Sequence, residues 1–356
     1  MAVFTSLEKN DIENFLSHYD VAKLIHFEGI LQGVDNTNYK IETTNGKYIL
    51  TIFENRIDPN DLPFFLNFMS HLKANGIVCP TPAHPSPQPS PMRGEDLGGG
   101  DSTILSLKNK PASLFSFLEG RDVKQNDITP ALCHELGILL GKMHMTGQSF
   151  PETRQNSMSF DAWEGRFHKI GHVANSYMET LQHLKTKWPQ DLPRGAVHLD
   201  LFPDNVFIKD NHIYGVIDFY FSATDFLAYD LAIVLNAWCF DSSSCHPDPR
   251  ESGAEGSHLS ESKEDSSVST LPQNDNTRFV FSEKKWGSFI DGYQSIRPLT
   301  TEEKNNFQTL CQGASLRFLS SRLHDYLFHD PKNLVIPKPP DEYIEKLEFH
   351  KHAKLF

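Results

Sequence analysis

The feature that most constrains this chain is a polar loop set between short apolar runs. It reads His-x-Asp-x-x-x-x-Asn, from His198 through Asp200 to Asn205, and an apolar strand, a turn at Asp210–Asn211 and a second apolar strand ending at Asp218 follow it. A hairpin of this length returns its last residue to the loop from which it started. We therefore expect the side chains of Asp200, Asn205 and Asp218 to face one cleft.

Phosphoryl transfer from ATP needs such a set of side chains. One carboxylate must lie beside the attacking hydroxyl, and oxygen ligands must hold the Mg²⁺ that is bound to the phosphates. Asp200 fits the first role, and Asn205 with Asp218 fits the second. The spacing is that of a kinase catalytic loop, although Asp-Phe-Tyr stands where protein kinases have Asp-Phe-Gly. The alternative is a set of ordinary turn and strand-end residues, but the complete series is much rarer by chance than a bare His-x-Asp.

The order of predicted elements divides the chain into two lobes. A leading helix, a sheet and a helix over Asp61–Asn75 come first, and beyond Gly120 the pattern is mainly helical. We expect an α+β fold with a small β-rich lobe over residues 1–119 and a larger helical lobe over residues 120–356. The predicted strands are Leu31–Ile41, Lys47–Phe53, Ile104–Leu107 and Ala112–Leu118, with a turn at residues 43–46. The predicted later helices are Thr129–Met145, Asp161–Lys187, Leu227–Phe240, Phe281–Ile296 and Glu302–Leu327.

Two segments have compositions that do not support a packed core. Residues 85–101 are rich in Pro and Gly, and residues 242–276 are rich in Ser and acidic side chains. Such segments bury too little apolar surface to offset the entropy of ordering them. We expect both to be flexible inserts in surface loops, and the second to be disordered.

Charge and cysteine content limit the partners and the compartment. The formal net charge of −13 argues against a nucleic-acid binder, because phosphate backbones attract basic surfaces. No apolar run of about 18 residues predicts a membrane span, and the N-terminus does not read as a secretory signal. The five cysteines form no CxxC pair, so neither a zinc cage nor a disulfide framework is indicated. We expect a cytoplasmic protein with reduced thiols; the sequence does not determine its oligomeric state.

The catalytic-loop series resembles that of the aminoglycoside-phosphotransferase and choline-kinase superfamily. The wider sequence is similar to the bacterial homoserine kinases of that superfamily, with resemblances in residues 33–39, 47–54, 61–66, 76–80, 236–239, 292–299, 316–318 and 321–323. The resemblance covers nearly the whole chain except the two inserts. It implies a two-lobed protein-kinase-like fold, ATP and Mg²⁺ as cofactors, and transfer of the γ-phosphate to the hydroxyl of L-homoserine in threonine biosynthesis. The alternative is a kinase for another small alcohol, such as choline, an aminoglycoside or a sugar-like metabolite.

The resemblance also implies a nucleotide site in the first lobe. A turn containing Gly33, Asn36 and Asn38 would cover the phosphates with backbone N–H groups, although it can equally be a plain hairpin. Phe117 and Glu119 would belong to the hinge, whose backbone groups would contact adenine.

The third strand departs from the usual kinase pattern. Thr51 stands roughly where most kinases place the Lys that holds the α- and β-phosphates, and the homoserine kinases share this feature. Lys47 and Arg56 flank the strand, but flanking bases are commonly solvated surface charges. Which cation neutralises the phosphates is therefore left open.

Homoserine carries an ammonium and a carboxylate, and an Arg fork is well suited to a carboxylate. Arg317 and Arg322 lie in an otherwise apolar helical pattern, so each is either a substrate anchor or the partner of a core carboxylate. Trp238 is a weaker substrate candidate, because a Trp in this apolar setting fits the core better.

Two residues are expected to support the catalytic loop. By the resemblance, Asp230 would brace the loop through hydrogen bonds, and His198 would pack and hydrogen-bond structurally instead of acting as a base. Asp225 lies one residue farther from Asp230 than is common in the superfamily, so its role is left open.

Overall fold

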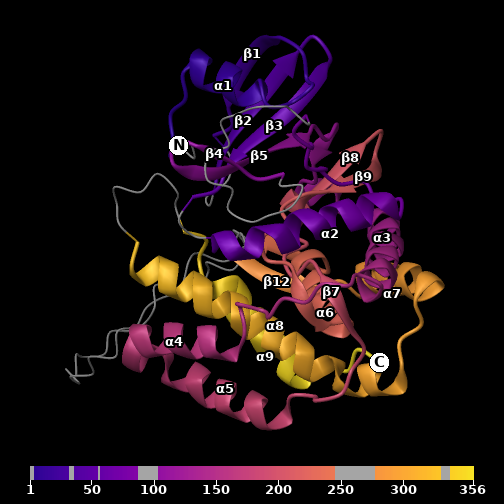
Figure 1. Cartoon of the computed structure of the whole chain (residues 1–356). Coiled ribbons are helices and arrows are strands. Elements are labelled where there is room, and N and C mark those ends of the chain that lie inside the picture. The colour runs from indigo at the N-terminus through magenta and orange to yellow at the C-terminus, as the bar shows by residue number, and fades with distance from the viewer. Residues whose placement is uncertain (1–3, 32–35, 55–56, 87–102, 245–276, 330–336) are drawn as a thin grey trace, which may run out of the picture.

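The structure is a computed structural model that describes residues 4–31, 36–54, 57–86, 103–244, 277–329 and 337–356. Within these residues, a five-stranded antiparallel sheet forms one end of the molecule and helices form most of the remainder (Figure 1). The expected α+β class, with a small antiparallel sheet near the N-terminus and a larger helical part, is confirmed. The division at residue 119 stays a prediction.

The five strands lie in the order β1, β2, β3, β5, β4, and each is antiparallel to its neighbours. They are β1 (Leu24–Gly29), β2 (Thr37–Thr43), β3 (Gly46–Ile52), β4 (Leu105–Leu107) and β5 (Lys110–Ser116). The sequence did not predict β1, because most of its side chains are polar or exposed and show no apolar alternation. The predicted strand Leu31–Ile41 starts instead at Thr37.

Helix α1 (Lys9–Leu16) covers one face of this sheet. Its Ile12 and Phe15 side chains are buried in a cluster with Tyr39 and Leu50 of the sheet. The opposite face carries side chains such as Asn38 and Thr51, whose positions pair across β2 and β3. A sheet with one apolar face and one polar face leaves the polar face for a ligand or another layer.

Helix α2 (Leu62–Ala74) begins and ends within one residue of its predicted bounds, and Gly76 follows it with a φ of 84°. Its apolar side chains belong to the core of the helical part and not to the cluster under α1. Phe68 contacts Phe219 and Phe150, with ring centroids 6.0 Å and 5.3 Å apart. The helix is thus anchored to the part of the chain that carries the catalytic loop.

Gly120, which follows the predicted hinge, has a left-handed backbone conformation. Its φ is 103°, and a Cβ there would lie 2.6 Å from the carbonyl oxygen of Ile208, so only glycine fits this approach. Two small sheets then carry the catalytic loop: β7 (Arg194–Val197) with β10 (Ala223–Phe226), and β6 (Arg121–Asp122), β8 (Val206–Lys209) and β9 (His212–Val216). The surrounding helices are α3 (Pro130–Gln148), α4 (Phe160–Ile170), α5 (Asn175–Lys187), α6 (Leu227–Trp238), α7 (Glu283–Ile296), α8 (Thr301–Leu327) and α9 (Asp341–His352).

Two expectations about the helices were wrong. The single helix predicted over Asp161–Lys187 is two helices, α4 and α5, because Gly171 with a φ of 78° interrupts them. The helix predicted over Leu227–Phe240 ends at Trp238. Helix α9 was not predicted at all.

The third error concerns the start of the second insert. Residues Phe240–Ser244 form strand β11, which pairs with β12 (Thr277–Phe281). The predicted disorder of residues 242–276 is therefore wrong for its first three residues, which gain backbone partners that composition does not reveal. The remaining residues of this insert, and residues 87–101 of the first, lie outside the described residues.

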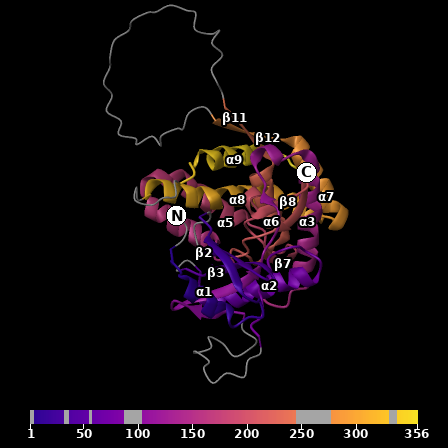
Figure 2. The ribbon, with the colours of Figure 1, turned by 90° about the horizontal axis from the view of Figure 1, so that it is seen from above.

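Seen from above, α8 and α9 lie side by side, and β12 lies against α9 (Figure 2). Among the helices formed by the described residues, none combines the length and apolarity that crossing a bilayer requires.

Candidate active site

The catalytic loop leaves β7 through an unusual backbone turn. Leu199 has a φ of 63° and Asp218, after β9, has a φ of 65°. Non-glycine residues seldom adopt this left-handed region, and such conformations persist only where surrounding contacts impose them. Leu199 directly precedes Asp200, and Asp218 is itself the predicted metal ligand. The strained backbone therefore lies where the chemistry is expected.

Asp230, at the start of α6, imposes the first of these turns. Its carboxylate accepts the backbone N–H of His198 at 3.1 Å and that of Leu199 at 2.8 Å. The Nε2 of His144 on α3 lies 3.1 Å from the same carboxylate. Burial alone would raise the pKa of Asp230, but the bond from His144 and the loop N–H hold it below its usual value. The predicted bracing contact is present.

The support continues through a fully buried chain of side chains. Since a carboxylate only accepts, His144 donates through Nε2, and its Nδ1 accepts from the Tyr293 hydroxyl at 2.7 Å. Arg297 donates to that hydroxyl at 3.0 Å and to Glu303 at 2.9 Å. Burial lowers the pKa of His144, which agrees with a neutral imidazole. The catalytic loop is therefore connected to the α7–α8 corner, a link that no local sequence signal indicated.

His198 also has the structural role expected of it. Its Nε2 donates to the carbonyl of Ile217 at 3.0 Å, while its Nδ1 accepts the backbone N–H of Asp200 at 3.2 Å. Both ring nitrogens are thus occupied, and burial lowers the pKa of His198. The imidazole ties the residue before Asp218 to the catalytic loop.

Asp200, Asn205 and the start of the Asp218 turn are brought together as the spacing predicted. The Asn205 amide nitrogen donates to the Asp200 carbonyl at 2.8 Å and to its carboxylate at 3.2 Å. The backbone N–H of Ile217 donates to the Asn205 carbonyl at 2.9 Å. Over the described part of the chain, no three His, Cys, Asp or Glu side chains gather as a metal site. The assignment of Asp200 to catalysis, and of Asn205 and Asp218 to metal binding, stays a prediction.

The three substrate candidates already have partners within the protein. Arg317, 3% exposed, donates to the Leu199 carbonyl at 2.6 Å, and Arg322 is ion-paired with Glu342 on α9. Trp238 is fully buried and donates to the Leu201 carbonyl at 2.8 Å. These positions favour support of the loop by Arg317 and Trp238 over direct contact with a substrate.

The predicted nucleotide residues lie on the polar face of the sheet or beside it. Gly33 lies outside the described residues. Asn36 accepts the backbone N–H of Glu54 at 3.3 Å, and Asn38 accepts the Thr51 hydroxyl at 2.7 Å. These bonds hold the start of β2 to β3 and to the residue Glu54 after it, and the role of Asn36 and Asn38 toward a nucleotide stays a prediction.

The predicted hinge follows β5. Phe117 is half-buried, and the Lys40 ammonium lies 5.9 Å from its ring centroid. Glu119 is exposed and ion-paired with Lys209, whose ammonium lowers the pKa of Glu119. The sheet also carries a cation beside this hinge, Lys40, which the sequence did not single out. Lys40 lies on β2, on the same face as Asn38, and is paired with Glu28 at 3.0 Å.

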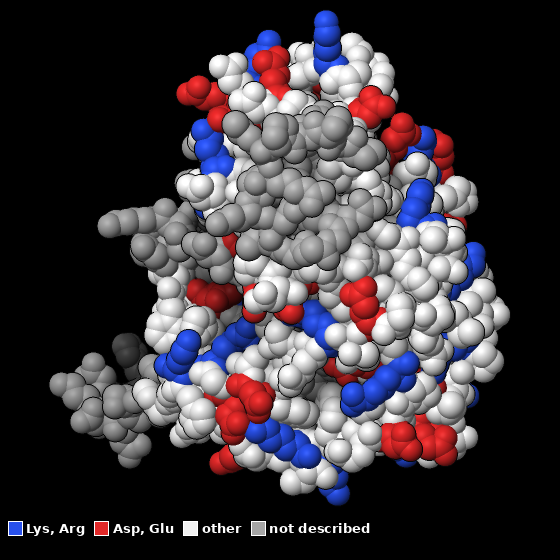
Figure 3. All heavy atoms as spheres, viewed as in Figure 1, with Lys and Arg blue, Asp and Glu red and all other residues white. Residues whose placement is uncertain are grey.

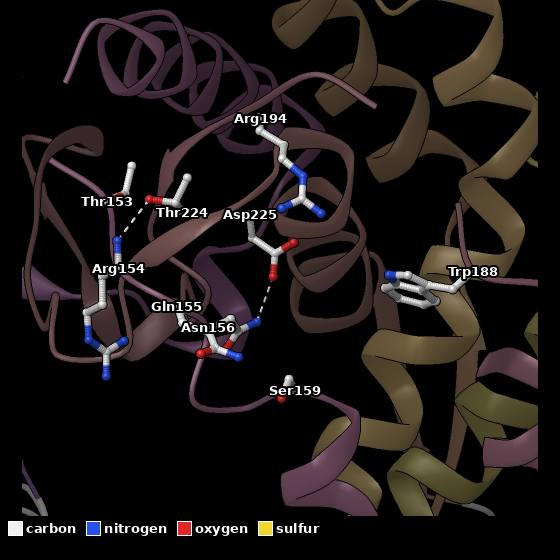
Figure 4. A pocket seen from close by; sticks show the side chains of 9 residues that line it. All are labelled: Thr153, Arg154, Gln155, Asn156, Ser159, Trp188, Arg194, Thr224 and Asp225. Atoms are coloured by element: carbon white, nitrogen blue, oxygen red, sulfur yellow. Dashed lines mark hydrogen bonds between the residues drawn. The ribbon is translucent and has the colours of Figure 1, made fainter. Parts of the chain in front are cut away.

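A separate cavity of about 440 Å³ lies at the start of β7, away from the catalytic loop that follows the strand (Figure 4). Asp225 points into it and accepts from Asn156 and from the backbone N–H of Phe226, both at 2.7 Å. Burial raises the pKa of Asp225. Asp225 therefore lines this cavity, while its role in the reaction stays open.

Acidic and basic side chains are interspersed over the described part of the face seen in Figure 3, so this face presents no extended surface of one charge.

Comparison with known proteins agrees with this arrangement. The profile described as the phosphotransferase enzyme family matches residues 26–258. A homoserine kinase of Paramagnetospirillum magneticum is 37% identical, with 98% of this chain and 96% of that protein covered. A homoserine kinase of Granulibacter bethesdensis is 38% identical, with 99% and 98% covered.

Solved structures show the same fold at low identity. An amicoumacin kinase superposes with a TM-score of 0.64 at 16% identity, covering 97% of this chain and 92% of its own. A choline kinase of Cryptosporidium parvum gives 0.60 at 12% identity, covering 97% and 94%. With the loop geometry and the full-length likeness to homoserine kinases, the chain is a member of the phosphotransferase enzyme family.

Proposed function

We propose that this protein transfers the γ-phosphate of ATP to the hydroxyl of L-homoserine, giving O-phospho-L-homoserine and ADP. The observation that carries the proposal is the likeness to proteins named homoserine kinase, which is 36–38% identical and spans nearly the whole chain. The reaction would supply threonine biosynthesis. The cytoplasm, which holds ATP, is the compartment we propose for it.

Positioning would provide most of the catalysis, because phosphoryl transfer asks little covalent chemistry of the protein. ATP would lie between the polar face of the sheet and the catalytic loop. Asp200, half-buried, would accept the proton of the acceptor hydroxyl. The contacts of Asp230 and His198 would hold Asp200 at a fixed distance from the phosphate.

The residues present fit a Mg²⁺ ion. Because the Asn205 amide nitrogen is used on Asp200, its amide oxygen is the atom available as a hard ligand, and the exposed Asp218 adds a carboxylate. We propose that Asn205 and Asp218 hold Mg²⁺, which neutralises charge on the phosphates when bound. The remaining ligands would be phosphate oxygens and water.

The direct test is ATP consumption by the purified protein with L-homoserine, choline, an aminoglycoside or no acceptor, with the product identified by phosphorus NMR. We expect turnover with L-homoserine and a phosphomonoester as product. Turnover with choline or the aminoglycoside alone would replace homoserine by that acceptor. Nucleotide binding without turnover of any acceptor would identify a nucleotide-binding regulator instead.

A further inference from the structure

Among the described residues that surround Arg317, one further arginine, Arg166, has a buried guanidinium nitrogen without a hydrogen-bond acceptor. The guanidinium of Arg317 donates a hydrogen bond to the Leu199 carbonyl and lies 4.6 Å from the centroid of the Phe318 ring. Arg322 is used by Glu342. Both cations therefore already have acceptors in the protein, and neither needs a ligand to satisfy it.

Arg166 on α4 is in a different situation. Its Nη1 is buried, and none of the described residues offers it a hydrogen-bond acceptor. Its Nη2 lies 3.1 Å from the thioether sulfur of Met158, which is a weak acceptor. An unsatisfied charged donor is expensive in a folded protein, so it calls for an explanation such as a missing ligand.

The surroundings of Arg166 are electropositive. Helices α4 and α8 pack together, and Arg317 of α8 is close enough to act on it. Burial lowers the pKa of Arg166, the positive charge of Arg317 lowers it further, and only Asp325 opposes them. Asp325 is itself exposed and hydrogen-bonded to His324 at 3.2 Å. The larger of the two charge effects on Arg166 is thus that of Arg317, the residue that holds Leu199.

We propose that Arg166 binds the carboxylate of the acceptor and so sets the specificity for an amino acid over a simple amino alcohol. The inference rests on the proposed function and names a residue that the sequence did not single out. An Arg fork can take both carboxylate oxygens, and Met158, which is flexible, can give up its contact to them. Arg317, whose charge acts on Arg166, donates to the carbonyl of Leu199, the residue before Asp200, and this contact links Arg166 to the catalytic loop.

The test compares two acceptors that differ only in the carboxylate, L-homoserine and 3-aminopropan-1-ol. In Arg166→Met, we expect the KM for L-homoserine to rise about 10- to 100-fold, as for the loss of a charge-assisted hydrogen bond. The KM for ATP and kcat/KM for 3-aminopropan-1-ol should stay within a factor of about two, because that acceptor has no carboxylate to lose. Arg166→Lys keeps the charge without the fork and should fall between the parent and Arg166→Met.

Arg194→Met is the matched control. Arg194 is exposed, lies 4.2 Å from the Phe226 ring centroid and lines the separate cavity, so its loss should leave the preference between the two acceptors unchanged.

An equal loss of activity on both acceptors in the two Arg166 variants would make Arg166 structural, and an unchanged KM for L-homoserine would remove it from the site. Thermal melting of each variant identifies misfolding. If Arg166→Met does not fold, the comparison of the two acceptors in Arg166→Lys alone tests the proposal. Failure of the parent to use L-homoserine at all would instead overturn the proposed function.

Discussion

At the scale of single residues, the catalytic loop is shaped by hydrogen bonds with side chains that lie far away in the sequence. Asp230 binds two loop amides, and Arg317 and Trp238 each donate to a loop carbonyl. The loop spacing predicted Asp200, Asn205 and Asp218 because their roles depend on local geometry. His144 and Arg297 could not be found in this way, since their function depends on which helices pack together.

Replacing Asp200 by Asn should leave ATP binding intact and lower kcat by about 10²–10⁴-fold, the usual contribution of a positioned proton acceptor. Steady-state turnover and calorimetric titration with ATP measure the two quantities. Turnover close to that of the parent would show that another group accepts the proton.

Asp230→Asn should destabilise the protein by about 1–3 kcal/mol, because the loop N–H groups lose a charged acceptor and the new amide N–H₂ faces donors. Denaturant unfolding measures the change, and kcat should fall as the loop relaxes. Asp210→Asn, in the exposed β8–β9 turn, is the control and should unfold like the parent. Equal stability of both variants would contradict the bracing role.

At the scale of elements, α3 and α7 approach closely through two glycines. A Cβ on Gly137 would lie 2.1 Å from the Phe289 carbonyl oxygen, and one on Gly292 would lie 2.1 Å from that of His134. This approach is what allows the His144–Tyr293 hydrogen bond between the same two helices. A helical pattern predicted both helices, but it could not indicate that they touch, because periodicity contains no information on partners.

Gly137→Ala should therefore lower the free energy of unfolding by about 1–3 kcal/mol, the typical cost of overpacking. Gly287→Ala on the same α7 is the matched control: nothing lies within 4 Å of its Cβ, and alanine favours the helix by up to about 1 kcal/mol. Chemical denaturation of the three proteins measures both effects. A Gly137→Ala variant as stable as the Gly287→Ala variant would show that α3 and α7 can move apart freely.

From the β11–β12 pair, we expect the second insert to be dispensable. Ser244 and Thr277, at the two ends of the segment 245–276, are paired across the strands. A two-residue Asn-Gly turn can connect such positions, because it matches the twist of a hairpin. The shortened protein should keep its melting temperature and its turnover of L-homoserine. Loss of turnover with an unchanged melting temperature would mean that the segment takes part in the reaction.

At the scale of the whole molecule, three buried histidines predict sensitivity to acid. Burial lowers the pKa of His144 and His198, and burial with the Lys346 cation lowers that of His350 to about 3. An unfolded imidazole has a pKa near 6.5, so below that pH the unfolded state binds protons that the folded state refuses. Stability is therefore complete above about pH 6.5 and falls as the pH is lowered.

Each buried imidazole should contribute up to about 1.4 kcal/mol per pH unit to this loss. Denaturant unfolding at pH 7.5, 6.5 and 5.5 measures the slope. In the parent protein, the Nε2 of His350 lies 3.0 Å from the side-chain oxygen of Asn236, and the amide of a glutamine can keep this hydrogen bond. His350→Gln should therefore reduce the slope of stability against pH by the contribution of one imidazole. An identical slope in parent and variant would show that His350 takes up a proton in the folded state.

The overall architecture was more predictable than its boundaries. The order of the predicted elements and the family resemblance predicted the fold class, since both depend on long stretches of the chain and not on exact boundaries. Helix α9 was missed because its buried residues, Tyr343, Lys346, Leu347 and His350, include two polar side chains and so show no apolar stripe. Lys346 is buried because Glu342 and the Asn236 carbonyl accept from its ammonium. Such compensated polar burial is visible only once the partners are placed.

The anchoring of α2 has a consequence for how such an enzyme can be controlled. Protein kinases regulate themselves in part by shifting a helix of the smaller lobe relative to the catalytic loop. Here Phe68 of α2 packs against Phe219, the residue after Asp218. The Nε2 of His71, also on α2, lies 3.1 Å from the Thr146 carbonyl oxygen of α3. Displacing this helix would expose aromatic core to water. We therefore expect a constitutively assembled enzyme, whose output follows the supply of nucleotide and acceptor and not an on–off movement of α2.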